Sequence, residues 1–146
     1  MALLSEEEKQ QLKQIMADYP NNEDLDLTAY IADVIGITGK HVEEGWYNQD
    51  INDTHITFYY ITDTDANHSD DKNEAEEYYI QVDIWSEEDC FLLKRKIKKL
   101  LKKAGFTYFA GNDDYEQDTK IYHKAARFCL IVIQDSIPAI LDKCKS

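Results

Sequence analysis

The segment between residues 76 and 130 constrains the fold of this chain most, because a strand, a helix and a hairpin follow one another there without a linker. Alternating apolar and polar residues over Glu76–Trp85 predict a half-buried strand. The Lys-rich apolar stripe that follows predicts a helix ending at Gly105. Two further strands, the second unusually long, are predicted over residues 106–110 and 120–134.

The rest of the chain predicts two N-terminal helices and one more strand. Ser5 and Glu8 have the spacing of a capping box, which predicts a first helix near residues 5–19. Ser86–Asp89 predicts the N-terminal cap of the Lys-rich helix. The other expected elements are a helix from Asp24 or Asp26 to Gly36, a loop over 37–53 with a short edge strand near 41–43, a strand over 54–62, a polar loop over 63–75 and a terminal helix turn over 137–141.

These elements predict an α+β fold, because hairpins and helices alternate without a repeating strand–helix–strand unit. We expect a mainly antiparallel sheet of about four strands with helices packed on one face. A helical crossover joins the two hairpins, so their relative orientation stays open. The single domain, 1–146, then consists of N-terminal helices over 1–36, a sheet and Lys-rich helix over 54–134, and a short C-terminal tail over 135–146.

Composition limits the classes of function. A chain of 146 residues with 43% hydrophobic content suits one globular core. Its formal net charge of −13 argues against a general binder of nucleic acid or of an anionic membrane, so proteins or cations are the expected partners. We expect neither a secretory signal nor a membrane span, and we expect Cys90, Cys129 and Cys144 to be free thiols of a reducing cytosol.

The Lys-rich helix concentrates positive charge. Seven of the sixteen basic residues fall within positions 94–103, so removing those seven from the total of −13 leaves −20 for the rest of the chain. A solvated helix face whose cations favour the C-terminal end of the helix dipole is one interpretation. A head-to-tail contact between copies is a second, and phosphate binding, which the surrounding acid opposes, is a third.

The acidic loop after the first strand has part of a calcium-binding pattern. Oxygen-bearing side chains occupy positions 1, 3, 5, 7, 9 and 12, but His68 stands where the sharp turn needs glycine and Asp70 stands where an apolar residue anchors the loop. Strands are also expected on both sides in place of helices. A solvated hairpin loop is therefore the preferred interpretation of Asp63, Asp65, Asn67, Ser69, Asp71 and Glu74.

No local motif nominates a catalytic, cofactor-binding or metal-binding residue. Nucleophilic catalysis needs a Ser or Cys beside a base and an orienting acid, and zinc sites need clustered His or Cys ligands. The four histidines are scattered, and His123 is expected to be a partly buried structural residue. We therefore expect a protein that is not an enzyme and that uses no cofactor.

Three segments, Tyr78–Ser86, Ile97–Phe106 and Asp114–Lys124, together with Arg127 and Phe128, carry a resemblance to a known family. They resemble the tail terminator, or tail-completion, proteins of long-tailed siphophages and prophages of Gram-positive bacteria. The run Asp-Tyr-Glu-x-Asp-Thr-x-x-Tyr-His-Lys is the specific part. The preceding helices and the strand over 54–62 match the family only in their order.

The resemblance implies a structural virion protein at the junction of tail and neck, made in the host cytoplasm. Family members form a hexameric ring that stops growth of the tail tube and joins the tail to the head-completion, or stopper, protein. Double-stranded DNA would pass through the lumen without specific binding, and no membrane is involved. Another neck adaptor, such as the stopper itself, and an acidic DNA-mimic inhibitor stay open as alternatives.

Subunit contacts are expected in the hairpin near residues 113–127, where acids precede bases with aromatic rings between them. The candidate interaction residues are Asp113, Asp114, Tyr115, Glu116, Asp118, Thr119, Tyr122, His123, Lys124 and Arg127.

Overall fold

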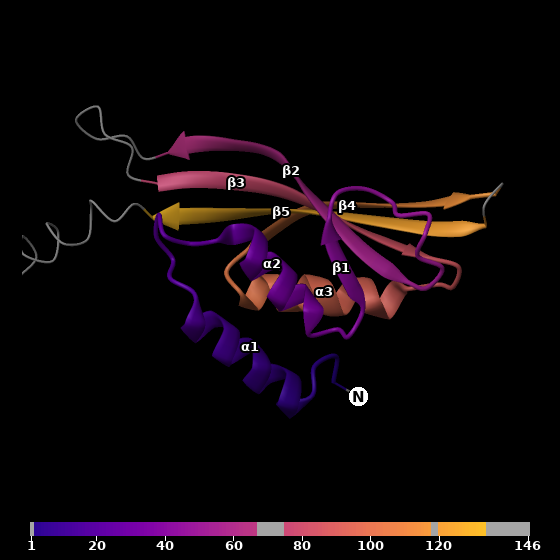
Figure 1. The fold of residues 1–146 in the computed structure, drawn as a ribbon, viewed down its shortest axis with the longest axis horizontal. Helices are drawn as coiled ribbons and strands as arrows, with labels where there is room; N and C mark the ends of the chain where they lie inside the picture. Colours follow the sequence, from indigo (N-terminus) through magenta and orange to yellow (C-terminus); the bar gives the residue numbers. More distant parts are fainter. Residues whose placement is uncertain (1, 67–74, 118–119, 134–146) are drawn as a thin grey trace, which may run out of the picture.

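The computed structural model describes residues 2–66, 75–117 and 120–133. Over these residues the chain forms helices packed against one face of a twisted sheet, as the sequence predicted (Figure 1). In chain order the elements are α1 (Glu6–Asp18), α2 (Leu27–Gly36), β1 (His41–Glu44), β2 (His55–Ala66), β3 (Ala75–Ser86), α3 (Phe91–Lys103), β4 (Thr107–Glu116) and β5 (Ile121–Ile133).

The sheet has five strands in the order β1-β2-β3-β5-β4, not about four. The fifth is β1, the short edge strand expected near residues 41–43, and it pairs parallel to β2, which makes the sheet mixed. All other neighbours are antiparallel. The α+β class is therefore confirmed, and the strand count is corrected.

The structure defines how the two hairpins meet. Strand β5 pairs antiparallel with β3 on one side and with β4 on the other. Because β3 and β4 are each antiparallel to β5, they run parallel to one another and α3 is the crossover that connects them. The helix packs against one face of the sheet, and its buried residues Ile97, Leu100 and Leu101 join the main core.

Two strands are longer than their sequence patterns predict. Strand β4 was expected over residues 106–110 but runs from Thr107 to Glu116, and β2 continues past residue 62 to Ala66. Gly, Asn and Asp are poor strand formers, yet each extension pairs with a partner strand that supplies its backbone hydrogen bonds. Register shifts between Tyr60 and Thr62 and between Tyr108 and Ala110 mark bulges in the two strands.

The helix caps agree with the sequence for two helices of three. Ser5 and Glu8 form the expected capping box of α1, and Asp26 caps α2. The cap predicted for α3 within Ser86–Asp89 is wrong, because the N-cap residue is Cys90 and it makes no side-chain cap bond. The Ser86 hydroxyl instead accepts a hydrogen bond from the Glu88 backbone N–H at 3.0 Å, at the end of β3. The helix turn expected over 137–141 lies outside the described residues.

A buried tyrosine joins α2 to the segment that follows α3, in addition to apolar packing. The Tyr30 hydroxyl of α2 donates to the carbonyl oxygen of Ala104, just after α3, at 2.8 Å. Its ring stacks near Phe106, with centroids 6.3 Å apart. Burial raises the pKa of Tyr30, as expected for a hydroxyl held neutral in the core.

We predict that Tyr30→Phe lowers the free energy of unfolding by about 1 to 2 kcal/mol, because the Ala104 carbonyl loses its buried donor. Urea unfolding followed by circular dichroism measures the change. Tyr59→Phe, whose ring lies on the other side of the sheet, is the matched control and should stay within about 0.5 kcal/mol. Equal stability of Tyr30→Phe and the wild-type protein would contradict this role for the hydroxyl.

Candidate interaction surface

The residues proposed from sequence for subunit contacts form the end of the β4–β5 hairpin, which projects beyond the N-terminal end of α3 (Figure 1). Cross-strand pairs place Asp113 opposite Lys124, Asp114 opposite His123, and Tyr115 opposite Tyr122. Asp118 and Thr119 lie outside the described residues. The structure therefore brings most of the predicted residues together.

These residues do not form one surface, because side chains alternate along each strand. Asp113, Tyr115, Tyr122 and Lys124 face the side of the sheet that carries the helices. The opposite side carries Asp114, Glu116, His123 and Arg127. The single candidate surface expected from sequence is thus corrected to two faces of one projecting hairpin.

On the helix side, a network of charges ties the hairpin to α3. Asp113 accepts from Lys94 at 2.9 Å through Oδ1 and from Lys124 at 3.2 Å through Oδ2. The hydrogen bond from Lys94 lowers the pKa of Asp113 below its usual range, and the bond from Lys124 lowers it further. Lys124 is buried, and Asp89 lies 3.7 Å from its Nζ. Asp113 and Lys124 therefore brace the hairpin within one chain.

A glycine makes this close approach possible. A Cβ at Gly111 would collide with the Tyr108 hydroxyl, and would lie 3.0 Å from Lys94 Nζ and 3.2 Å from the Ala125 carbonyl oxygen. The carbonyl is backbone and cannot move aside as a flexible side chain can. Gly111 therefore lets Lys94 lie against β4, a role that no sequence motif indicated.

On the opposite side, a buried acid positions His123. His123 Nε2 and Asp83 Oδ1 form a hydrogen bond of 2.6 Å. The Gln81 amide also donates to Oδ1 at 2.9 Å, and Gln81 accepts from Arg127 Nε at 3.0 Å. Asp83 is 0% exposed, and its Oδ2 has no hydrogen-bond partner among the described residues.

Aromatic rings seal this polar cluster from the side away from the helices. The His123 ring stacks on Trp85 with centroids 3.9 Å apart and an interplanar angle of 8°. Trp46 meets Trp85 and His123 edge-on, at 5.0 and 5.4 Å. Trp46 and its neighbour Tyr47 come from the region 37–53, where the sequence predicted a loop with a short edge strand near residues 41–43. The face of β3 that points away from the helices carries Tyr79, Gln81, Asp83 and Trp85. Aromatic residues at two of these four positions indicate that another part of the chain covers this face.

The chemistry of the cluster is structural. A His oriented by an Asp has the form of a general base, but nucleophilic catalysis also needs a Ser or Cys hydroxyl or thiol beside the imidazole. Around His123 the described contacts are Asp83 and the rings of Trp46 and Trp85. The nearby Thr57 hydroxyl accepts from the Trp85 indole at 2.9 Å. This arrangement fixes the position of β5 and agrees with the expectation of a structural histidine.

Three of the cations on α3 contact other elements of the chain. Lys94 pairs with Asp113, and Lys96 pairs with Glu8 of α1. Lys98 instead lies over the Tyr108 ring, 3.9 Å from its centroid. The interpretation as a plain solvated face therefore holds for only part of the helix, because three of its cations contact other elements.

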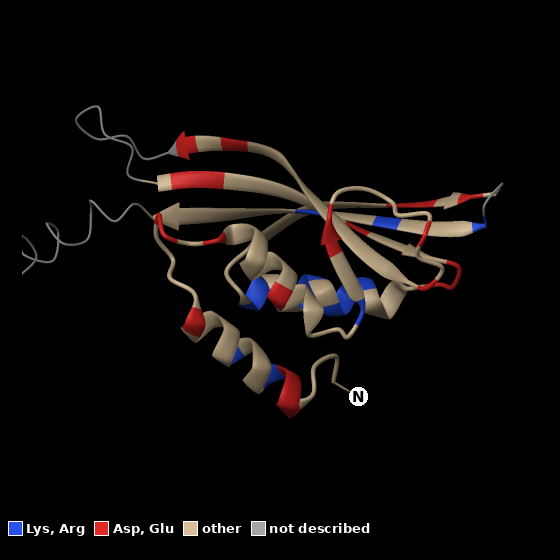
Figure 2. Ribbon diagram, viewed as in Figure 1, with Lys and Arg blue, Asp and Glu red and all other residues tan. Residues whose placement is uncertain are grey.

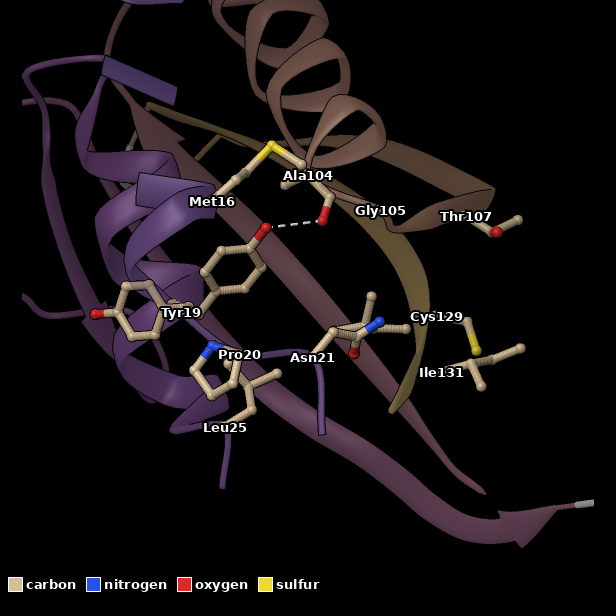
Figure 3. A pocket seen from close by; sticks show the side chains of 12 residues that line it. Met16, Tyr19, Pro20, Asn21, Leu25, Ala104, Gly105, Thr107, Cys129 and Ile131 are labelled. Atoms are coloured by element: carbon tan, nitrogen blue, oxygen red, sulfur yellow. Dashed lines mark hydrogen bonds between the residues drawn. The ribbon is translucent and has the colours of Figure 1, made fainter. Parts of the chain in front are cut away.

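A pocket of about 320 Å³ lies between the α1–α2 connection and the last residues of β5 (Figure 3). Its titratable groups are poor nucleophiles. The hydrogen bond to Asp33 raises the pKa of Tyr19 to about 12, and burial raises the pKa of the Cys129 thiol. The Tyr30 hydroxyl is already bonded to the Ala104 carbonyl. The pocket offers apolar packing and no activated group.

The structure contradicts the calcium-loop pattern at its first two ligand positions. Asp63 and Asp65 lie in β2, paired with Tyr78 and Glu76 of β3, and so do not open a loop. The remaining positions of that pattern, 67–74, lie outside the described residues. Within the described ranges, no group of three or more His, Cys, Asp or Glu side chains could hold a metal ion. No described helix is long and apolar enough to span a membrane.

No protein-family model matches this chain, and no curated protein matches it. Among solved structures, a chain of the virion of a native gene transfer agent particle is similar, with a TM-score of 0.46 and 10% sequence identity. The alignment covers 88% of this chain and 99% of that chain. A similarity this distant assigns neither a family nor a function to this protein.

Replacing Asp83 tests whether the polar cluster holds the sheet together. We expect Asp83→Ala to lower the free energy of unfolding by about 2 to 3 kcal/mol, because Gln81 and His123 lose their shared buried acceptor. Chemical denaturation measures it. Glu87→Ala, an exposed acid just after the same strand, should change the free energy by less than about 0.5 kcal/mol. Equal effects of the two substitutions would rule out a special role for Asp83.

Acid should loosen the brace between the hairpin and α3. The pKa of Asp113 is lowered in the folded state, so its stabilising effect is complete above its ordinary value of 3.8 and is lost as the pH falls through the lower, folded value. Asp113→Asn should therefore make the free energy of unfolding less dependent on pH below about pH 4. Unfolding curves at several acidic pH values, compared with those of Asp24→Asn, measure this. An unchanged pH dependence would contradict the brace.

Proposed function

We propose that this protein is a structural virion protein that forms a ring, terminates the tail tube of a phage-like particle and joins the tail to the head connector. The proposal starts from the resemblance carried by Tyr78–Ser86, Ile97–Phe106 and Asp114–Lys124. It involves no catalysis and no cofactor. Its site of action would be the virion neck, reached after synthesis in the host cytoplasm.

One structural observation carries the proposal furthest. The described residues of the segment with the most specific resemblance, 114–117 and 120–124, belong to the projecting end of the β4–β5 hairpin, which other parts of the chain hold on both sides. Asp113 with Lys94 and Lys124 holds the helix side, and Asp83 with Trp85 holds the opposite side. A surface presented on rigid elements loses little conformational entropy on binding, which suits an assembly contact. Tyr115, which is 43% exposed, supplies an aromatic contact there.

The charge distribution is compatible with a ring around DNA. Outside the seven cations of positions 94–103 the chain carries a net charge of −20, so acidic side chains are plentiful on its other surfaces. Acidic side chains that face a lumen would repel the phosphate backbone, so DNA could pass without being held. Placement of these acids on the outer rim of an assembled ring would contradict this part of the proposal.

The alternative neck adaptor and the DNA mimic give different results in simple assays. A DNA mimic would stay monomeric or dimeric and would compete with DNA for a basic partner. A stopper would act after DNA packaging, on the head side of the neck. A tail terminator would act on the tail, before the tail meets the head.

We predict that particles lacking this protein have overlong tails without attached heads in negative-stain electron microscopy, because tube growth would continue unchecked. Supplying the wild-type protein in trans should restore tails of uniform length. Supplying an unrelated virion gene is the matched control. DNA-filled heads that leak, with tails of normal length, would instead indicate a stopper and contradict tail termination.

A further inference from the structure

The outer side of α3 forms a cationic hollow that has no acidic partner among the described residues. Residues at helical spacing line an open hollow of about 520 Å³ together with Leu3 from the segment before α1. In the described part of the chain, none of its cations pairs with a carboxylate, unlike Lys94 and Lys96 on the neighbouring side of the helix. The lining cations are Arg95, Lys98, Lys99, Lys102 and Lys103.

Exposed apolar side chains of the kind found at protein contacts lie at the start of the same helix, outside the lining of the hollow. Phe91 and Leu92, at the start of the same helix, are 53% and 65% exposed. Arg95 lies over the Phe91 ring, 5.8 Å from its centroid. Exposed aromatic and Arg side chains next to one another are typical of the energetically dominant part of an interface.

We propose that this hollow on α3 receives the acidic end of the β4–β5 hairpin of a second copy of the chain. The inference rests on the proposed ring function and names the contact between neighbouring subunits. Asp114 and Glu116, which share the face of the hairpin that points away from the helices, would meet the cations. Each copy thus presents a hairpin on one side and accepts one on another, which is a heterologous contact that closes into a ring when its rotation allows.

The hairpin of the same chain is not in a position to occupy the hollow. Its Asp113 is bonded to Lys94, in the first turn of α3, and the hairpin runs from there away from the helix (Figure 1). The hollow extends instead toward Lys102 and Lys103 in the last turn. No acidic segment among the described residues of the same chain therefore fills it, and the proposal takes the occupant from another molecule.

A nucleic-acid backbone fits this surface less well than an acidic hairpin. The first turn of α1 carries Glu6, Glu7 and Glu8, and the Glu8–Lys96 ion pair holds that turn against α3 (Figure 2). A long polyanion laid along the helix would meet these carboxylates. A narrow hairpin can place its few acids in the hollow and avoid them. The net charge of −13 also opposes the approach of DNA from a distance.

Exchanging the charges between the two surfaces tests the contact. One variant carries Lys99→Glu, Lys102→Glu and Lys103→Glu, the second carries Asp114→Lys and Glu116→Lys, and the third combines both sets. Self-association is measured by size-exclusion chromatography with light scattering over a range of protein concentration and salt, with and without tail-tube protein. Circular dichroism checks that each variant folds.

We expect wild-type rings to weaken about tenfold or more in each of the first two variants, because several close ion pairs become like-charge contacts. The combined variant should recover most of the association, since the pairs are restored with reversed sign. Controls reverse two charges elsewhere in each case: Lys13→Glu with Lys40→Glu, and Glu23→Lys with Asp24→Lys. These exposed sites should leave association unchanged.

The outcomes separate this inference from the proposed function. Wild-type protein that caps tail tubes, with reversed variants that cap equally well, would overturn the hairpin contact and leave tail termination intact. Loss of association in both variants without recovery in the combined one would overturn the hairpin as the occupant. Binding of a DNA duplex to the wild-type protein that the α3 reversal abolishes would indicate a polyanion site instead. Wild-type protein that neither associates nor caps tubes would overturn the proposed function itself.

Discussion

The antiparallel pairing of β3 with β5 is the interaction on which the rest of the structure depends, because it joins two hairpins into one sheet. Its register runs without a shift from Ala75 opposite Ile133 to Ser86 opposite Tyr122. Side chains alternate along both strands, so this register decides which of them meet α3 and which lie beneath Trp46. A slip of β3 by one residue would turn Asp83 into the apolar core and Trp46 would lose the ring it covers.

The same pairing explains how the end of the hairpin keeps its shape where no helix lies beneath it. There the helices do not bury apolar side chains of the sheet, and polar contacts stabilise the hairpin instead. Lys94 reaches Asp113 from α3, and Asp83 reaches His123 from β3. Both braces come from elements outside the hairpin, so they fix its position relative to the body of the protein as well as its internal register.

The sequence was sufficient for the elements whose own residues bury an apolar face. The capping box at Ser5, the helix ending at Gly36 and the alternating strand over Glu76–Trp85 are all present, because local spacing alone determines them. The outer half of β4 and the contacts of Trp46 were missed, because each depends on a strand distant in sequence. The candidate residues were located together, yet their division into two faces and the use of Asp113 as a brace required the register with β5.

The acidic residues of this chain also restrict how copies can meet. Strand β4 is one edge of the sheet, and β2 beyond Phe58 has no β1 partner on its outer side. Edge strands invite pairing between chains, and charged side chains are a common defence. Asp63 and Asp65 on β2 and Asp114 on β4 would face like charges if two edges paired. Acid on these edges therefore opposes pairing of edge with edge, which is compatible with the proposed approach to the cationic side of α3.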